Sequence, residues 1–75
     1  MSVYPNPAID NIHITLPENV QQAVFTLHDM QGKMLIKQEV GSQDKVEVNG
    51  LAAGIYLYKV TTDKESYQGK LIIKN

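Results

Sequence analysis

The stretch QAVFTLHDMQGKMLIKQEV, residues 22–40, decides the fold that the sequence predicts. Its first half alternates apolar and polar residues with a period of two, which is typical of a half-buried β-strand. The apolar residues that share one side are Ala23, Phe25 and Leu27. Asp29 to Gly32 interrupts this pattern, and glycine supplies the positive φ that a tight turn requires. A second apolar run follows at once, so the stretch predicts a β-hairpin.

The positions of the charged residues in the second run, residues 33–40, predict which of its sides is buried. Met34, Ile36 and Val40 share one parity, whereas Leu35 has the parity of Lys37 and Glu39. Because charged side chains are seldom buried without a partner, we expect the side of Met34, Ile36 and Val40 to face the core.

The same period of two continues on both sides of the hairpin. We expect further strands at residues 11–16, 45–48, 55–62 and 67–74, each bounded by turn residues. Their expected inward residues are Ile12, Ile14, Leu16, Val46, Val48, Tyr56, Tyr58, Val60, Leu71 and Ile73. Strands at a spacing of about ten residues are typical of a sandwich. The predicted fold class is all-β: a small antiparallel immunoglobulin-like β-sandwich of six to seven short strands. A helix is the alternative for residues 18–29 alone, and the β-branched and aromatic run there favours a strand.

Residues 3–8, VYPNPA, place two prolines two positions apart, ahead of the first alternating run. Proline fixes φ, donates no backbone hydrogen bond, and restricts the preceding residue to extended geometry. The segment is therefore stiff and extended, and it cannot begin a helix or fill a central strand. We expect this segment to connect an upstream part of the chain to the first strand and to fix the direction in which the chain enters it.

Composition excludes several classes of function. With 75 residues the chain forms one domain at most. The net charge is −1, and all seven basic residues are lysine, which argues against binding to nucleic acid or to an anionic membrane. The absence of cysteine excludes disulfides, thiolate metal sites and a cysteine nucleophile, and it slightly favours an intracellular site. No apolar run reaches the ~20 residues of a membrane span.

A signal peptide is also missing from the start of the chain. If the domain leaves the cytoplasm, we expect its targeting address to have been removed or to lie on a longer parent chain.

The sequence offers no constellation for catalysis. His13 lies on the polar side of its strand, and His28 stands beside Asp29 at a strand end, where the nearest nucleophile is Thr26. Adjacent strand residues point to opposite faces, so the His–Asp pair is interpreted as packing at a turn. GLAAG, residues 50–54, lacks the lysine and the helix of a phosphate loop. We therefore predict no enzyme, no metal site and no cofactor.

The final stretch GKLIIKN, residues 69–75, has two interpretations. Lys70 and Lys74 flank Ile72 on the expected outer face, while Leu71 and Ile73 anchor the inner face. Lysine blunts the pairing of exposed sheet edges, so the pattern fits a protected edge strand. It also fits a surface that a partner recognises.

Four pieces of the chain, taken together, resemble one family. They are YPNPAIDNIHI at residues 4–14, LHDMQGKML at 27–35, LAAGIYLYKV at 51–60 and GKLIIK at 69–74. In this order, and over Val3 to Lys74, the chain resembles the C-terminal sorting domain of the type IX (Por) secretion system, type A.

The resemblance implies a function that strand patterns cannot show. Such domains end larger secreted proteins of Gram-negative bacteria, whose signal peptide takes them across the inner membrane. The folded domain is then recognised in the periplasm and carries its cargo across the outer membrane to the cell surface or the medium. The implied partners are an outer-membrane translocon or shuttle and a sortase-like protease that removes the domain, with no nucleic acid and no direct membrane insertion. This match overrides the weak preference for an intracellular site.

The resemblance also assigns residues by their positions in this sequence. Pro5, Asn6 and Pro7 match the family's entrance motif, and the machinery either recognises them directly or, as we favour, recognises only the fold that they start. Lys70 and Lys74 match its terminal motif, and we expect these two lysines, with Ile72 between them, to contact the machinery. The expected structural residues are Asp10, Asp29, Gly32, Gly54, Tyr56 and Gly69. Residues 1–2 are expected to be additions at the start, and residues 3–75 the sorting domain, a fragment of a larger secreted protein. If the first strand were truncated, an exposed sheet edge would favour a homodimer.

The rival interpretation is an immunoglobulin-like accessory module that binds carbohydrate or the cell surface. Such a module would usually offer an exposed aromatic platform, whereas Tyr56 and Tyr58 have the parity of core residues here.

Overall fold

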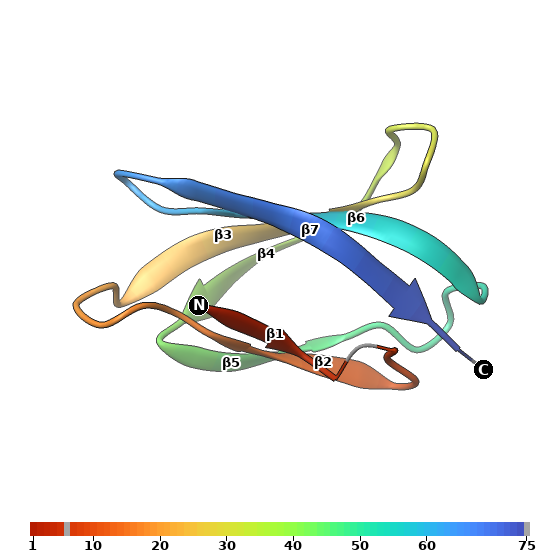
Figure 1. The fold of residues 1–75 in the computed structure, drawn as a ribbon, viewed down its shortest axis with the longest axis horizontal. Coiled ribbons are helices and arrows are strands. Elements are labelled where there is room, and N and C mark those ends of the chain that lie inside the picture. The colour runs from red at the N-terminus through yellow and green to blue at the C-terminus, as the bar shows by residue number, and fades with distance from the viewer. Residues whose placement is uncertain (6, 75) are drawn as a thin grey trace.

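Seven β-strands build the computed structural model, which describes residues 1–5 and 7–74 (Figure 1). The strands are β1 (Ser2–Tyr4), β2 (Asn11–Thr15), β3 (Gln22–His28), β4 (Met34–Gly41), β5 (Gln43–Glu47), β6 (Gly54–Thr61) and β7 (Ser66–Ile73). Residues 22–28 are a strand, so the helical alternative for this stretch is excluded. The all-β prediction is confirmed.

The strands form two antiparallel sheets that face each other as a small sandwich (Figure 1). One sheet has the order β1-β2-β5, and the other has the order β4-β3-β6-β7. In the seven-stranded immunoglobulin arrangement the fourth strand belongs to the sheet of the first, second and fifth strands. Here β4 pairs with β3 instead. The immunoglobulin-like pattern therefore holds with one strand moved to the other sheet.

The core lies between the two sheets and is lined by Ala8 and by inward residues that alternation predicts. Its buried apolar residues are Ala8, Ile12, Ile14, Leu16, Ala23, Phe25, Leu27, Val40, Val46, Val48, Tyr56, Val60, Leu71 and Ile73. Tyr58 is half-buried and packs against this cluster. Each buried aliphatic or aromatic side chain contributes about 1.5–3 kcal/mol by leaving water. The hydrophobic effect therefore holds the two layers together.

The predicted burial of β4 is wrong at its first residue. Met34 is 49% exposed, and both Leu35 and Ile36 are half-buried. The register explains this, because Leu27 pairs with Ile36 whereas the next residue, His28, pairs with Met34. Leu35 is therefore the extra residue of a β-bulge. The bulge turns Met34, which precedes it, to the outer face of the sheet. Val40 lies beyond the bulge and is buried as predicted.

A hydrogen bond fastens the chain where β5 leads into β6. The Tyr56 hydroxyl donates to the carbonyl of Ala52, four residues upstream. A tyrosine near the start of the sixth strand that bonds back to the preceding corner is the tyrosine corner of immunoglobulin-like sandwiches. Tyr56 therefore combines a buried ring with a bond that anchors the corner.

Gly69 in the edge strand β7 is covered by the side chain of its partner in β6. A Cβ on Gly69 would lie 2.7 Å from the Tyr58 hydroxyl oxygen and 2.9 Å from Cζ of the same ring. The Tyr58 ring also stacks on Phe25, with the ring centroids 6.3 Å apart. An aromatic ring laid over an edge glycine is a recognised way to stabilise a strand that lacks a side chain.

Gly69→Ala is expected to destabilise the domain by about 1–3 kcal/mol, because the new methyl group must displace the Tyr58 ring from its contact with Phe25. Urea unfolding measures this cost. Gly54→Ala is the matched control, since a Cβ at Gly54 meets nothing within 4 Å. In a Tyr58→Leu background the cost of Gly69→Ala should fall, and an unchanged cost would contradict the role of the ring.

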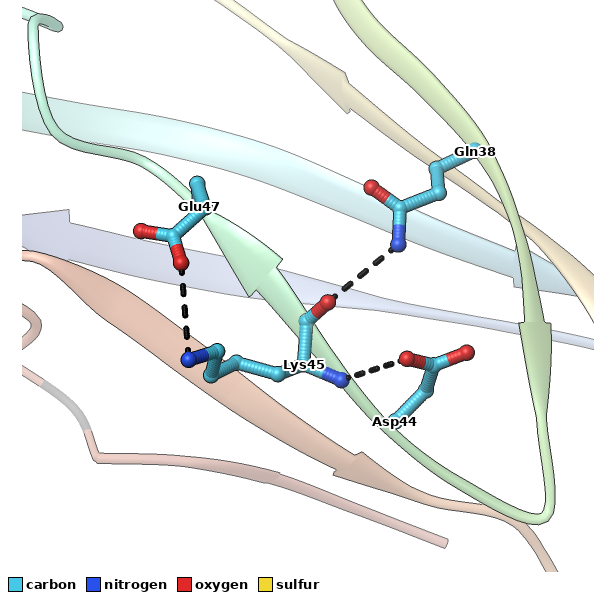
Figure 2. A network of polar contacts seen from close by, with 4 residues as sticks. All are labelled: Gln38, Asp44, Lys45 and Glu47. Carbon is cyan, nitrogen blue, oxygen red and sulfur yellow. Dashed lines mark hydrogen bonds and ion pairs between the residues drawn. The ribbon is translucent and has the colours of Figure 1, made fainter.

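The chain crosses from one sheet to the other between β4 and β5, where Ser42 alone separates the two strands. Asp44 secures this crossing, because its carboxylate accepts hydrogen bonds from the backbone N–H of Gly41 at 3.1 Å and of Lys45 at 2.8 Å. Gln38 reaches over from β4 and donates to the Lys45 carbonyl (Figure 2). The Lys45–Glu47 ion pair beside them is exposed and adds little.

The bonds to Asp44 lower the pKa of its carboxyl below the ordinary value of 3.8, with the Lys45 N–H as the largest cause and the Gly41 N–H as the second. A lowered pKa in the folded state means that the carboxylate stabilises the fold above its unfolded pKa. This stabilisation is lost as the pH falls through the folded-state pKa.

Asp44→Ala should therefore lower Tm at pH 7, and the two Tm values should converge as the pH falls below 3.8. Thermal unfolding followed by circular dichroism from pH 7 down to strongly acidic conditions checks this. Asp63→Ala removes an exposed aspartate from another turn as a control. A Tm difference between Asp44→Ala and wild type that persists undiminished in acid would contradict the electrostatic explanation.

Candidate functional site

The segment that precedes β2 is bound to the end of the last strand. The Ala8 N–H donates to the carbonyl of Ile72, and the Lys74 N–H donates to the carbonyl of Ala8, both at 2.7 Å. Ala8 and Ile73 thereby form a parallel β-bridge, and both side chains are buried. We call this contact the terminal joint.

The same segment changes sheets. Tyr4 ends β1, which pairs with β2 of the three-stranded sheet. A cis peptide bond joins Tyr4 to Pro5, and three residues later Ala8 lies against the four-stranded sheet. The carbonyl of Asp10 then accepts hydrogen bonds from the backbone N–H of Val48 and Asn49 after β5, which returns the chain to the first sheet. The stretch between β1 and β2 therefore makes contact with both layers.

The terminal joint brings together predicted recognition residues that lie far apart in the sequence. Pro7 is exposed and directly precedes Ala8, while Ile72 and Lys74 bracket the Ala8 bridge from the other strand and are exposed as well. Pro5 and Lys70 are also exposed. Asn6 lies outside the described residues. The start and the end of the domain thus contribute to a single surface.

On the outer face of the four-stranded sheet, this surface continues into β6. Ile72 pairs with Ile55, and Lys70 pairs with Leu57. Because neighbours across an antiparallel ladder point to the same face, these side chains lie side by side. Ile55, Leu57 and Ile72 are 49%, 39% and 41% exposed. The last two strands therefore present aliphatic side chains to solvent with lysines beside them.

Asp29 and Gly32 lie in the turn between β3 and β4. The Asp29 carboxylate accepts hydrogen bonds from the backbone N–H of Gln31 and Lys33, both at 2.9 Å. Gly32 has a φ of 91°, a conformation that side chains rarely adopt. Each residue type therefore has a local physical reason in this turn.

The remaining predicted structural residues differ in the contacts that they make. Tyr56 and Gly69 have the contacts described above, and Asp10 contributes its backbone carbonyl while its side chain is exposed. Gly54 has an ordinary backbone φ and open space where a Cβ would lie. The local structure thus gives no steric reason for glycine at position 54.

Sequence reasoning missed Ala8, the residue at the centre of the terminal joint. It belongs to no regular strand, so periodicity does not mark it. Its only signal is a small side chain directly after the second proline, with the same parity as Ile12 and Ile14. A bridge to a residue 65 positions later cannot be deduced from that signal.

The histidines stand apart from any catalytic arrangement. His13 is exposed and stacks on Tyr4, with ring centroids 5.5 Å apart. His28 shares a hydrogen bond with Thr26 through Nε2 at 3.3 Å. Within residues 1–5 and 7–74 there is no group of three or more His, Cys, Asp or Glu side chains that could hold a metal ion. In the same part of the chain no helix is long and apolar enough to cross a membrane.

Comparison with known proteins agrees with the resemblance drawn from the sequence. The model of the secretion system C-terminal sorting domain family matches residues 2–74. Beta-agarase D of Zobellia galactanivorans is 31% identical over 74 residues, a match that covers 97% of this chain and 15% of the agarase. A domain of this family interacts with the secretion machinery, and its cargo is secreted or attached to the cell surface. The chain therefore belongs to the family of type IX secretion system C-terminal sorting domains and is a non-catalytic sorting signal.

Proposed function

We propose that this domain is read by the secretion machinery at the terminal joint, where the proline segment and the end of β7 form one surface. The observation that carries the proposal is the pair of backbone hydrogen bonds that hold Ala8 between Ile72 and Lys74. Because these bonds join the two ends of the domain, they belong to the folded sandwich and are absent from an unfolded chain. Secretion machinery that binds this surface would therefore recognise the folded domain and would not recognise an unfolded chain.

Within this proposal the exposed side chains have a different role from the buried ones. Lys70, Ile72 and Lys74 contact the machinery, together with Pro5, Asn6 and Pro7, of which Asn6 lies outside the described residues. Asp29, Gly32, Tyr56 and Gly69 serve mainly to hold the fold, and Asp10 does so through its backbone carbonyl, whereas the structure offers no steric reason for the expected structural role of Gly54. The bonds of Asp29 and Tyr56 and the ring over Gly69 support this division.

The proposed route has three stages. The domain is recognised in the periplasm, an outer-membrane translocon or shuttle exports it with its cargo, and a sortase-like protease then removes it at the cell surface. The domain belongs to a larger secreted protein, as the match to a 15% portion of beta-agarase D supports.

A homodimer through an exposed sheet edge stays a prediction. Among the described strands, β1 and β5 are the edges of one sheet, and β4 and β7 are the edges of the other.

The carbohydrate-binding alternative has less support. Tyr56 is buried, and Tyr58 and Tyr67 pack against the core. Tyr4 is 49% exposed, but its ring face is stacked on His13. An exposed row of rings, which a sugar-binding platform usually requires, is therefore missing among the described residues.

The substitutions Lys70→Ala and Lys74→Ala together should block export of a cargo fusion while leaving Tm near wild type. The reason is that both side chains are exposed, so their removal leaves the core and the backbone bonds of the joint intact. The fusion carries a signal peptide, a fluorescent reporter and residues 1–75, and it is expressed in hosts with and without the secretion system.

Surface fluorescence of the fusion measures export. Lys45→Ala with Lys64→Ala is the matched control, since it removes two exposed lysines elsewhere. Normal export of the Lys70/Lys74 variant would reject the signal role of these lysines. Equal export of the wild-type fusion with and without the system would reject the proposed function itself.

A further inference from the structure

Aliphatic side chains are exposed across the outer face of the four-stranded sheet, well beyond the terminal joint. Met34 in β4 pairs with His28 in β3, which pairs with Leu57 in β6, which in turn pairs with Lys70 in β7. Ile55 and Ile72 form the neighbouring row towards the end of β7. The four aliphatic members, Met34, Ile55, Leu57 and Ile72, are each between 39% and 49% exposed.

Lysines border this apolar area. In the next row, Lys37 of β4, Thr26 of β3 and Lys59 of β6 are neighbours, and both lysines are exposed. Lys70 pairs with Leu57 and lies on the edge strand β7, and Lys74 directly follows the end of that strand; both are exposed. The outward residues of these strands include one carboxylate, Glu39, which pairs with Val24 in the row beyond Lys37.

The charge distribution is therefore uneven. The chain has eight acidic residues and seven lysines, which gives a net charge of −1. Four of the seven lysines border this face, whereas seven of the eight carboxylates lie elsewhere. An aliphatic area with a basic border on an otherwise acidic domain marks an interaction site.

We propose that this lysine–aliphatic face, formed by Met34, Lys37, Ile55, Leu57, Lys59, Lys70, Ile72 and Lys74, docks onto a protein surface of the secretion machinery that presents apolar side chains bordered by carboxylates. The inference rests on the proposed function and adds the chemistry of the partner. It also adds Lys37 and Lys59, which no motif singles out. The aliphatic centre provides apolar area that is buried on binding. The charged border orients the domain on its partner and raises the rate of association.

The chemistry of the face favours such a protein over other occupants. A second copy of this chain would place lysines opposite lysines across a two-fold axis, which is repulsive. A membrane interface favours Trp and Tyr, and nucleic acid favours Arg. The chain has no Trp and no Arg, and its tyrosines are in the core or on β1.

The decisive experiment reverses the charge of the two lysines that lie outside the terminal motif. Lys37→Glu with Lys59→Glu, in the reporter fusion described above, is expected to lower surface fluorescence at least tenfold. Lys37→Arg with Lys59→Arg keeps the charge and should export normally. Lys45→Glu with Lys64→Glu places the same reversal in β5 and in the β6–β7 turn, and it should also export normally.

A second pair of variants tests the apolar centre. Ile55→Ser with Leu57→Ser should lower export, whereas Met30→Ser, at a residue 61% exposed in the β3–β4 turn, should not. Thermal unfolding of each purified 75-residue variant separates lost docking from lost folding. The Tm of Lys37→Glu with Lys59→Glu should stay within about 4 °C of wild type, since exposed substitutions cost little.

Each contrary outcome has a distinct meaning. Normal export of Lys37→Glu with Lys59→Glu, from a wild-type fusion that needs the system, overturns this inference and leaves the proposed function standing. Co-sedimentation of the free chain with phosphatidylglycerol vesicles, lost in the same variant, would overturn it in favour of a membrane surface. A dimer in analytical ultracentrifugation that this variant dissociates would overturn it in favour of a second copy.

Discussion

The terminal joint is the contact on which the arrangement of this domain depends. Two small sheets share a core of aliphatic and aromatic residues, and the hydrophobic effect that joins them has no direction of its own. The two 2.7 Å hydrogen bonds around Ala8 are directional, and they fix the start of the chain against the end of β7. The carbonyl of Asp10 then ties the same segment to the residues after β5. One short irregular stretch thus links both layers.

This arrangement suits a domain of 75 residues, because a small core contributes little stability and the chain ends must be held by other contacts. The tyrosine corner at Tyr56, the Asp29 turn and the Asp44 crossing each satisfy backbone groups where the chain turns back within a sheet or changes sheets. The lysines and aliphatic residues of the outer face are exposed, and in our proposal they serve recognition. In this proposal, stability and recognition depend on different residues of the same strands.

Strand positions and inward faces could be predicted because a period of two is a local property of the sequence. Ile12, Phe25, Val46 and Leu71 are buried as alternation requires. The prediction failed at Met34 because a bulge at Leu35 inserts one residue into the count, and no local signal marks that insertion. The joint at Ala8 was missed for a different reason, since its partner lies at the far end of the chain.

By itself the sequence determined the all-β class, the turn at Asp29 to Gly32, the absence of a catalytic constellation and the family. Motifs and alternation suffice for these, because they depend on neighbours along the chain. Only the tertiary structure decided that the predicted β3–β4 hairpin shares a sheet with β6 and β7, that the proline segment meets the end of β7, and that Lys37 and Lys59 share a face with Lys70. These depend on register and on packing between distant segments, which is settled when the two sheets bury a common core.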